Sequence, residues 1–208
     1  VTLEVDPGYL DAILTFQFIA TRPNMRAVNH SWGKPTISPE ELLDGNSQLT
    51  LALDWSAGAH NVLHLVAGNQ GNTADIPLPK DNFNGMVIGR SEIKDGVFRR
   101  VSDGNNFDKD ATGDRSSIAL IAPGDSIELS SIHANGDRHR VTNGGTSYAT
   151  PHVTGTVALL HEYANSRINA SAPHWTGTVP SGSTARRHEV MKAVLMNSTD
   201  KIKDDGTF

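Results

Sequence analysis

Residues 143–155 read NGGTSYATPHVTG and are the most informative part of the chain. A glycine-rich turn leads to Ser147 at the start of a helix-periodic segment, and Gly144 and Gly145 permit close approach of other backbone. A helix N-terminus offers unpaired N–H groups and a positive dipole end, which suit a developing oxyanion. Physical chemistry alone leaves two interpretations, a nucleophile turn or an anion-binding turn. The second lacks the lysine of a phosphate-binding loop, and Ala149 stands where an esterase elbow has its second glycine.

Length and composition predict one domain with an ordinary core. The chain has 208 residues, of which 37% are hydrophobic. Its formal net charge of −5 argues against a general nucleic-acid binder. The absence of cysteine excludes disulfides, thiolate metal sites and a cysteine nucleophile. No apolar run approaches the roughly 20 residues that cross a bilayer, so no membrane span is expected.

Hydrophobic periodicity predicts helices that alternate with strands. A first helix is expected over residues 7–21, with Leu10, Ile13, Leu14 and Phe18 at helical spacing, and a second from the capping box 38–41 to about Ala59, with a break at Gly45. A third is expected from Ser147, with Val153, Val157, Leu160 and Ala164 on one face. The last is expected over 188–197, with Val190, Val194 and Leu195 facing inward. Strands are expected over 26–31, 62–67, 86–89 and 117–122, with more peripheral ones over 98–101 and 127–132. This alternation predicts a parallel, doubly wound sheet. Small residues at Thr154 and Gly155 predict close packing of the serine helix on that sheet.

Residues 145–153, GTSYATPHV, resemble the nucleophile motif of the subtilisin-like serine proteases (subtilases, peptidase S8) at nearly every position. The resemblance implies that Ser147 is the nucleophile of an acyl transfer. It also implies an α/β fold with a mostly parallel, doubly wound sheet and helices on both faces. The segment 121–124, IAPG, resembles the turn that precedes the serine helix in this family.

Residues 66–71, VAGNQG, resemble the oxyanion-hole motif of the family. The resemblance implies that Asn69 donates its side-chain amide to the tetrahedral intermediate, a contribution of about 2.7–4 kcal/mol to the barrier in subtilisin itself. The alternative for Asn69 is a turn-forming asparagine.

Residues 27–33, AVNHSWG, resemble the substrate-binding strand of the family. The resemblance implies that the peptide pairs as an added β-strand with Ser31, Trp32 and Gly33. The opposite wall of the pocket would be formed by Val66, Ala67 and Gly68. Trp32 stands where many members have leucine, which predicts a narrower apolar subsite.

The family's triad runs in the order Asp, His, Ser, but neither the Asp motif nor the His motif occurs in these residues. Residues 1–5 resemble the strand that follows the catalytic His helix. Residues 1–208 are therefore expected to form a single, incomplete peptidase domain that lacks its N-terminal strands, with Asp and His upstream of Val1. The isolated fragment is expected to be inactive, since serine without a base is a poor nucleophile. An open strand edge is expected too, to be completed by the missing segment or by another chain.

None of the histidines is identified as the base by spacing. His30 and His64 lie inside strand patterns and are expected to pack in the sheet. Surface positions are expected for His133, His139, His161, His174 and His188. His152 matches a family position whose role is structural.

These residues predict a serine endopeptidase acting on peptides or proteins without a cofactor. Structural calcium is left open and unlocated, because the acidic segment 103–114 lacks the spacing of a calcium-binding loop. A secreted or cell-envelope location follows only from the resemblance. The alternative is a non-catalytic subtilase-fold module that binds peptides or partners. Intact Ser147 and Asn69 weigh against that alternative, and an esterase on another α/β fold is remote.

Overall fold

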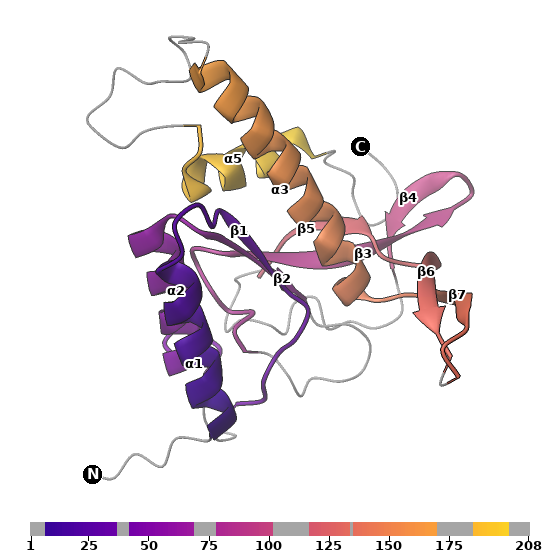
Figure 1. Ribbon diagram of the computed structural model, residues 1–208, viewed down its shortest axis with the longest axis horizontal. Coiled ribbons are helices and arrows are strands. Elements are labelled where there is room, and N and C mark those ends of the chain that lie inside the picture. The colour runs from indigo at the N-terminus through magenta and orange to yellow at the C-terminus, as the bar shows by residue number, and fades with distance from the viewer. Residues whose placement is uncertain are drawn as a thin grey trace.

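The computed structural model describes residues 7–36, 42–68, 78–101, 117–133, 135–169 and 185–199. Helices and strands alternate from α1 to β2, as the sequence predicts, whereas β2 to β7 follow one another without a described helix between them (Figure 1). The helices are α1 (Pro7–Ala20), α2 (Gln48–His60), α3 (Thr146–Asn169) and α5 (His188–Ser198). The strands are β1 (Ala27–His30), β2 (Leu63–Ala67), β3 (Met86–Lys94), β4 (Val97–Arg100), β5 (Ile118–Pro123), β6 (Ile127–Ile132) and β7 (Arg138–Asn143).

The main sheet is mostly parallel. Strand β1 pairs with β2, β2 with β3 and β3 with β5, all in parallel, while β4 turns back to pair antiparallel with the distal half of β3. Within the described residues β1 is an edge strand, because it pairs only with β2. The expectation that further N-terminal strands cover this edge remains a prediction.

Helices cover both faces of the sheet, which confirms the predicted doubly wound class. Along β2, successive side chains alternate between the two layers, as the pleat of a strand requires. Leu63 and Leu65 pack in the core beneath α3 and α5. Val66 packs in the second core, beneath α1 and α2. Since α3 contacts β1, β2, β3 and β5, it is the helix that ties this sheet together.

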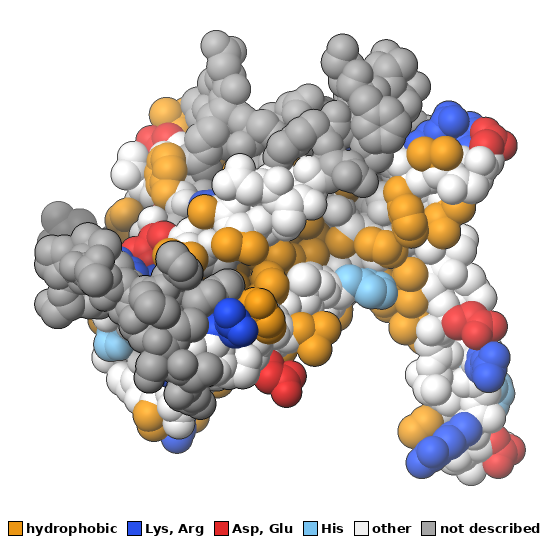
Figure 2. All heavy atoms as spheres, turned by 90° about the horizontal axis from the view of Figure 1, so that it is seen from above, with side chains coloured by type: hydrophobic (Ala, Val, Ile, Leu, Met, Phe, Trp, Pro, Cys, Tyr) orange, Lys and Arg blue, Asp and Glu red, His pale blue; other side chains and the backbone are white. Residues whose placement is uncertain are grey.

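Strands β6 and β7 form a separate antiparallel hairpin that stands away from the rest of the molecule (Figure 2). The sequence predicts β6 but not β7, because RHRVTN has too few apolar residues to show a strand pattern. Strand β7 ends only a few residues before Ser147, so the hairpin leads directly into the start of α3.

Two helices present faces that differ from the expectation. Leu10, Leu14 and Phe18 of α1 are 47–56% exposed. The face of α1 that enters the core carries Tyr9, Phe16 and Ala20. Both sets have helical spacing, so periodicity alone could not choose between the two apolar stripes.

The same correction applies to α5. Val190 and Val194 are exposed, whereas His188, Met191 and Leu195 are buried. Leu195 is the one inward residue that the sequence identifies correctly on this helix.

Helix α2 begins later than expected. Its N-cap is Ser47, whose hydroxyl accepts a hydrogen bond from the N–H of Thr50 at 3.1 Å. The helix therefore starts beyond the break expected at Gly45, and the predicted capping box at 38–41 lies outside the described residues. Asn61 ends the helix in the left-handed conformation, where its N–H donates to the carbonyl of Ala57.

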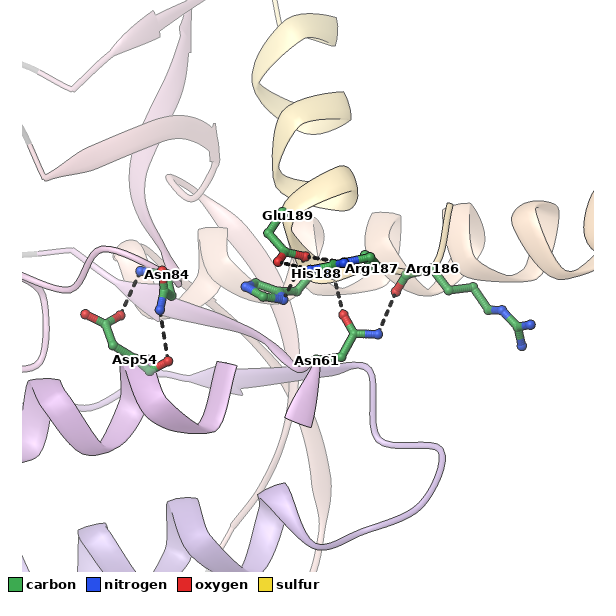
Figure 3. A network of polar contacts seen from close by, with 7 residues as sticks. All are labelled: Asp54, Asn61, Asn84, Arg186, Arg187, His188 and Glu189. Carbon is green, nitrogen blue, oxygen red and sulfur yellow. Dashed lines mark hydrogen bonds and ion pairs between the residues drawn. The ribbon is translucent and has the colours of Figure 1, made fainter. Parts of the chain in front are cut away.

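Side-chain amides and carboxylates fix α2 to its neighbours (Figure 3). Asn61 accepts from the N–H of His188 at 2.7 Å, which anchors the first residue of α5. The carboxylate of Asp54 accepts from the N–H of Asn84 at 2.7 Å, just before β3. These contacts join the two helical layers at one end of the sheet. None of the described helices is long and apolar enough to cross a membrane.

Candidate active site

Ser147 lies in the first turn of α3, where it is half-buried. The turn that delivers it is held by the segment after β5, because the N–H of Gly145 donates to the carbonyl of Gly124 at 2.7 Å. The N–H groups of Tyr148 and Ala149 then donate to the carbonyl of Gly145 at 3.0 and 3.2 Å, which starts the helix. The last residue of the IAPG segment, Gly124, thus accepts the hydrogen bond that holds this turn.

Two strand ends meet the start of α3. The hydroxyl of Ser31, just after β1, donates to the carbonyl of Ser147 at 3.1 Å. The hydroxyl of Thr146 donates to the carbonyl of Gly68, just after β2, at 2.7 Å. The turn therefore sits over the carboxyl ends of two adjacent parallel strands, the usual place for a ligand site in an open α/β sheet.

The structure brings Ser31, Gly68 and Ser147 together and places the other predicted site residues around them. Ala67 is buried beside Gly68. Val66 and Trp32 point to the opposite face of the sheet, in the core beneath α1 and α2. Gly33 is half-buried and precedes Lys34, whose backbone forms two hydrogen bonds with Leu78. Asn69 directly follows Gly68 and lies outside the described residues.

Gly68 has a packing role in addition to any role in substrate binding. A Cβ at this position would lie 2.7 Å from the Cδ1 of Ile118 and 3.2 Å from the carbonyl oxygen of Ile88. A residue without a Cβ is therefore required here, because β5 and β3 fill the space on this side.

Gly155 corrects another expectation. It is exposed, and a Cβ at this position would meet no described atom within 4 Å. The close packing of α3 on the sheet is made instead by Ala149, Val153 and Val157, all of which are buried.

No described histidine serves Ser147 as a base. Within the described part of the chain, the hydroxyl of Ser147 forms no hydrogen bond. His30 is adjacent to Ser31 on the strand and therefore points to the opposite face. His152, one turn along α3, is exposed, and its Nδ1 lies 2.9 Å from the carbonyl oxygen of Tyr148.

The sequence missed a buried chain of hydrogen bonds on the far face of the sheet. His30 Nε2 lies 2.8 Å from His64 Nδ1, and His64 Nε2 lies 3.0 Å from the hydroxyl of Ser56. Such a Ser–His–His series resembles a proton relay, but the three residues are at most 3% exposed, so no substrate can reach them. Burial in the sheet was predicted for His30 and His64; only their pairing was not.

Two other histidines correct the expectation of surface positions. His161 on α3 is 8% exposed and His188 on α5 is 4% exposed. Burial is the largest cause that lowers the pKa of each, which favours the neutral form of both side chains. Among the residues that the structure describes, no group of three or more His, Cys, Asp and Glu side chains could hold a metal ion.

The contact between Thr146 and Gly68 predicts a measurable loss of stability. In Thr146→Val the buried hydroxyl is replaced by a methyl group of similar size, and the carbonyl of Gly68 loses this donor. We expect a fall of about 1–3 kcal/mol in the free energy of unfolding, measured by urea denaturation. Thr156→Val is the matched control, because that exposed hydroxyl donates only along its own helix and its loss should change stability by less than about 0.5 kcal/mol. Equal effects of the two changes would contradict the prediction.

Solved structures that resemble this chain share its fold. The prenylagaramide maturation protease PagA shares 20% identity at a TM-score of 0.58, covering 100% of this chain and 62% of that one. The PatG macrocyclase, in complex with peptide, shares 19% identity at a TM-score of 0.60, covering 96% and 51%. Fervidolysin from Fervidobacterium pennivorans, a keratinolytic enzyme related to subtilisin, shares 22% identity at a TM-score of 0.52, covering 76% and 22%.

These likenesses establish a common fold, and this chain spans no more than 62% of any of the three proteins. No curated protein sequence matches the chain. The family model of the subtilases, Peptidase_S8, matches residues 8–208, which include Ser147 and both strand ends that contact its helix. The chain belongs to the subtilase family.

Proposed function

We propose that this chain carries the nucleophile, an oxyanion donor and the substrate strand of a serine endopeptidase. The observation that supports the proposal most strongly is the position of Ser147. It lies at the N-terminus of a long helix and is tied by Ser31 and Thr146 to the carboxyl ends of β1 and β2. A helix N-terminus at this point supplies N–H donors for an oxyanion.

The proposed chemistry is acyl transfer. The oxygen of Ser147 attacks the peptide carbonyl carbon, and its proton passes to a histidine base. The negative oxygen of the tetrahedral intermediate is held by the side-chain amide of Asn69 and by a backbone N–H at the start of α3. The carbon–nitrogen bond then breaks as the base protonates the leaving amine, and water hydrolyses the acyl-enzyme by the same steps in reverse order. This chemistry uses protein groups alone and needs no cofactor.

We propose that the histidine and its aspartate belong to a segment upstream of Val1. The absence of a base near Ser147 among the described residues supports this assignment. The unpaired edge of β1 offers the place where that segment, or another chain, would add strands to the sheet. The same reasoning predicts that residues 1–208 alone are inactive.

The substrate would bind as an extended strand. It would pair with the backbone of Ser31 to Gly33 on one side and face Ala67 and Gly68 on the other, whereas the side chain of Val66 points into the core beneath α1 and α2. A secreted or cell-envelope location is part of the same proposal, on the ground of family membership alone.

One observation favours a second function, a peptide-binding subtilase module without catalysis. The hydroxyl of Ser147 has no base beside it in the described part of the chain. If the upstream segment supplied no base, the substrate strand could still bind a peptide, and Ser147 would have only a structural role in the first turn of α3.

A fluorophosphonate probe distinguishes the two functions, because it reacts with a serine only when a base activates that serine. Two proteins would be treated, residues 1–208 and the same chain with its native upstream coding region, and the labelled residue would be mapped by mass spectrometry. We expect labelling of Ser147 in the extended protein alone, and none in its Ser147→Ala variant. Labelling of neither protein would favour the binding module. Labelling of the shorter protein would place a base within residues 1–208 and contradict the proposed upstream triad.

A further inference from the structure

Four aromatic rings form a buried column between the sheet and α1. Phe16 of α1 lies edge-on to His30 and to His64, with ring centroids 5.3 and 5.5 Å apart. The two imidazoles stack at 5.1 Å and 23°. Trp32 completes the column, stacked on Phe16 at 6.1 Å and 23° and edge-on to His30 at 5.8 Å. The ring of Trp32 is therefore held by one apolar and one polar neighbour.

A directional chain of hydrogen bonds fixes His30. The hydroxyl of Ser56 donates to the carbonyl of Phe16, so its oxygen accepts the proton on His64 Nε2. His64 Nδ1 is then an acceptor, and it receives the proton on His30 Nε2. One neutral tautomer of each imidazole satisfies the whole chain, which leaves the His30 ring a single orientation beside Trp32.

Trp32 belongs to the segment that we assign to the substrate strand. It lies two residues after His30, so the two side chains emerge on the same face of the extended chain. Trp32 follows the end of β1 and is half-buried, so the core does not enclose this residue completely. A shift of this ring would change the apolar surface offered to a side chain of the bound peptide.

We propose that His30, held by His64 and Ser56, is a positioning residue that fixes the ring of Trp32 and thereby the size of the apolar subsite beside the substrate strand. The proposal rests on the proposed peptidase function for the identity of the ligand. The contact itself depends only on the described geometry. His30 touches no substrate and takes no part in the chemistry, since it faces away from Ser147.

Two substitutions separate positioning from a general packing role. His30→Gln keeps an amide N–H near the place of Nε2 and can still donate to His64. His30→Leu keeps an apolar side chain in the core but removes the donor. Both would be made in the extended protein with Trp55, Trp175 and every tryptophan of the upstream segment replaced by phenylalanine, so that the fluorescence comes from Trp32 alone. His60→Leu is the control, because the ring of His60 contacts Trp55 and not Trp32.

We expect His30→Leu to shift the Trp32 emission to longer wavelength, and His30→Gln and His60→Leu to leave it unchanged. With peptide substrates that carry either phenylalanine or alanine at the subsite, His30→Leu should change the ratio of their KM values by about 10-fold, with kcat preserved. His30→Gln should restore the parent ratio. An unchanged emission and KM ratio in His30→Leu would overturn the proposal, as would equal changes in His30→Gln. If no form hydrolysed peptides, the proposed function would fail, and the emission would by itself decide the positioning role.

Discussion

The protein is expected to lose a substantial part of its stability as the pH falls from about 6.5 toward about 3, because His30 and His64 must then take up protons. In the folded state, burial lowers the pKa of His30 from 6.5 to about 4. Burial, followed by the neighbouring His30 and His188, lowers the pKa of His64 from 6.5 to about 3. Each imidazole is therefore kept neutral well below the pH at which it would be charged in water.

The sign of the effect follows from proton binding by the two states. In the unfolded chain each histidine titrates near 6.5, so below this pH the unfolded state holds more protons than the folded state. The contribution of the two histidines to stability is fully present above about pH 6.5 and declines as the pH falls. It levels off only below their pKa values in the folded state. The pKa difference of His30 alone corresponds to roughly 3 kcal/mol, a large part of the 5–15 kcal/mol of a typical domain.

Urea denaturation at a series of pH values between about 7 and about 4 would measure this loss. The double variant His30→Leu/His64→Val removes both buried imidazoles and should show a much flatter dependence on pH. His152→Gln is the control, because that histidine is exposed, and its pH dependence should match the parent. A double variant as acid-sensitive as the parent would contradict the assignment to this pair.

The elements of the fold could be predicted where a local pattern sufficed. A few neighbouring residues are enough to predict four features: the serine helix, β1, β2 and the glycine-rich turn before Ser147. Helix α1 has two apolar stripes on adjacent faces. Tyr9 and Phe16 are buried because their face packs against α2 and the sheet, and this packing cannot be read from α1 alone. Strand β7 exists because β6 pairs with it, which no property of RHRVTN reveals.

The candidate site was predicted through its motifs rather than its geometry. Ser31 and Ser147 are 116 residues apart in sequence, and their hydrogen bond depends on the parallel register of the sheet. The pairing of His30 with His64 depends on the same register, in which His64 lies opposite Val28 and His30 lies opposite Val66, two residue pairs further along the strands. Sequence reasoning identified both residues as sheet-packing histidines, but the hydrogen bond between them depends on how the two strands are aligned.

Gly124→Ala is expected to disrupt the nucleophile turn more than any other small substitution near it. A Cβ at this position would lie 2.8 Å from the carbonyl oxygen of Gly145, 2.8 Å from the Cβ of Arg90 and 2.9 Å from the Cβ of Ala149. None of these atoms is the flexible end of a side chain, so β3, the turn or α3 must move. The hydrogen bond from Gly145 to Gly124 would be strained by the same movement.

We expect Gly124→Ala to lower the free energy of unfolding by about 3 kcal/mol, the upper end for an overpacked core. Displacement of Ser147 by about 1 Å would also slow its reaction with the fluorophosphonate by roughly 100-fold in the extended protein. The control is Gly58→Ala in α2, where the nearest atom would be the Nδ2 of Asn84 at an ordinary 3.6 Å. That change should be neutral or stabilise by up to about 1 kcal/mol, because alanine is the better helix former. If Gly124→Ala matched this control in both stability and labelling rate, the turn would tolerate displacement, and the segment after β5 would have no part in holding Ser147.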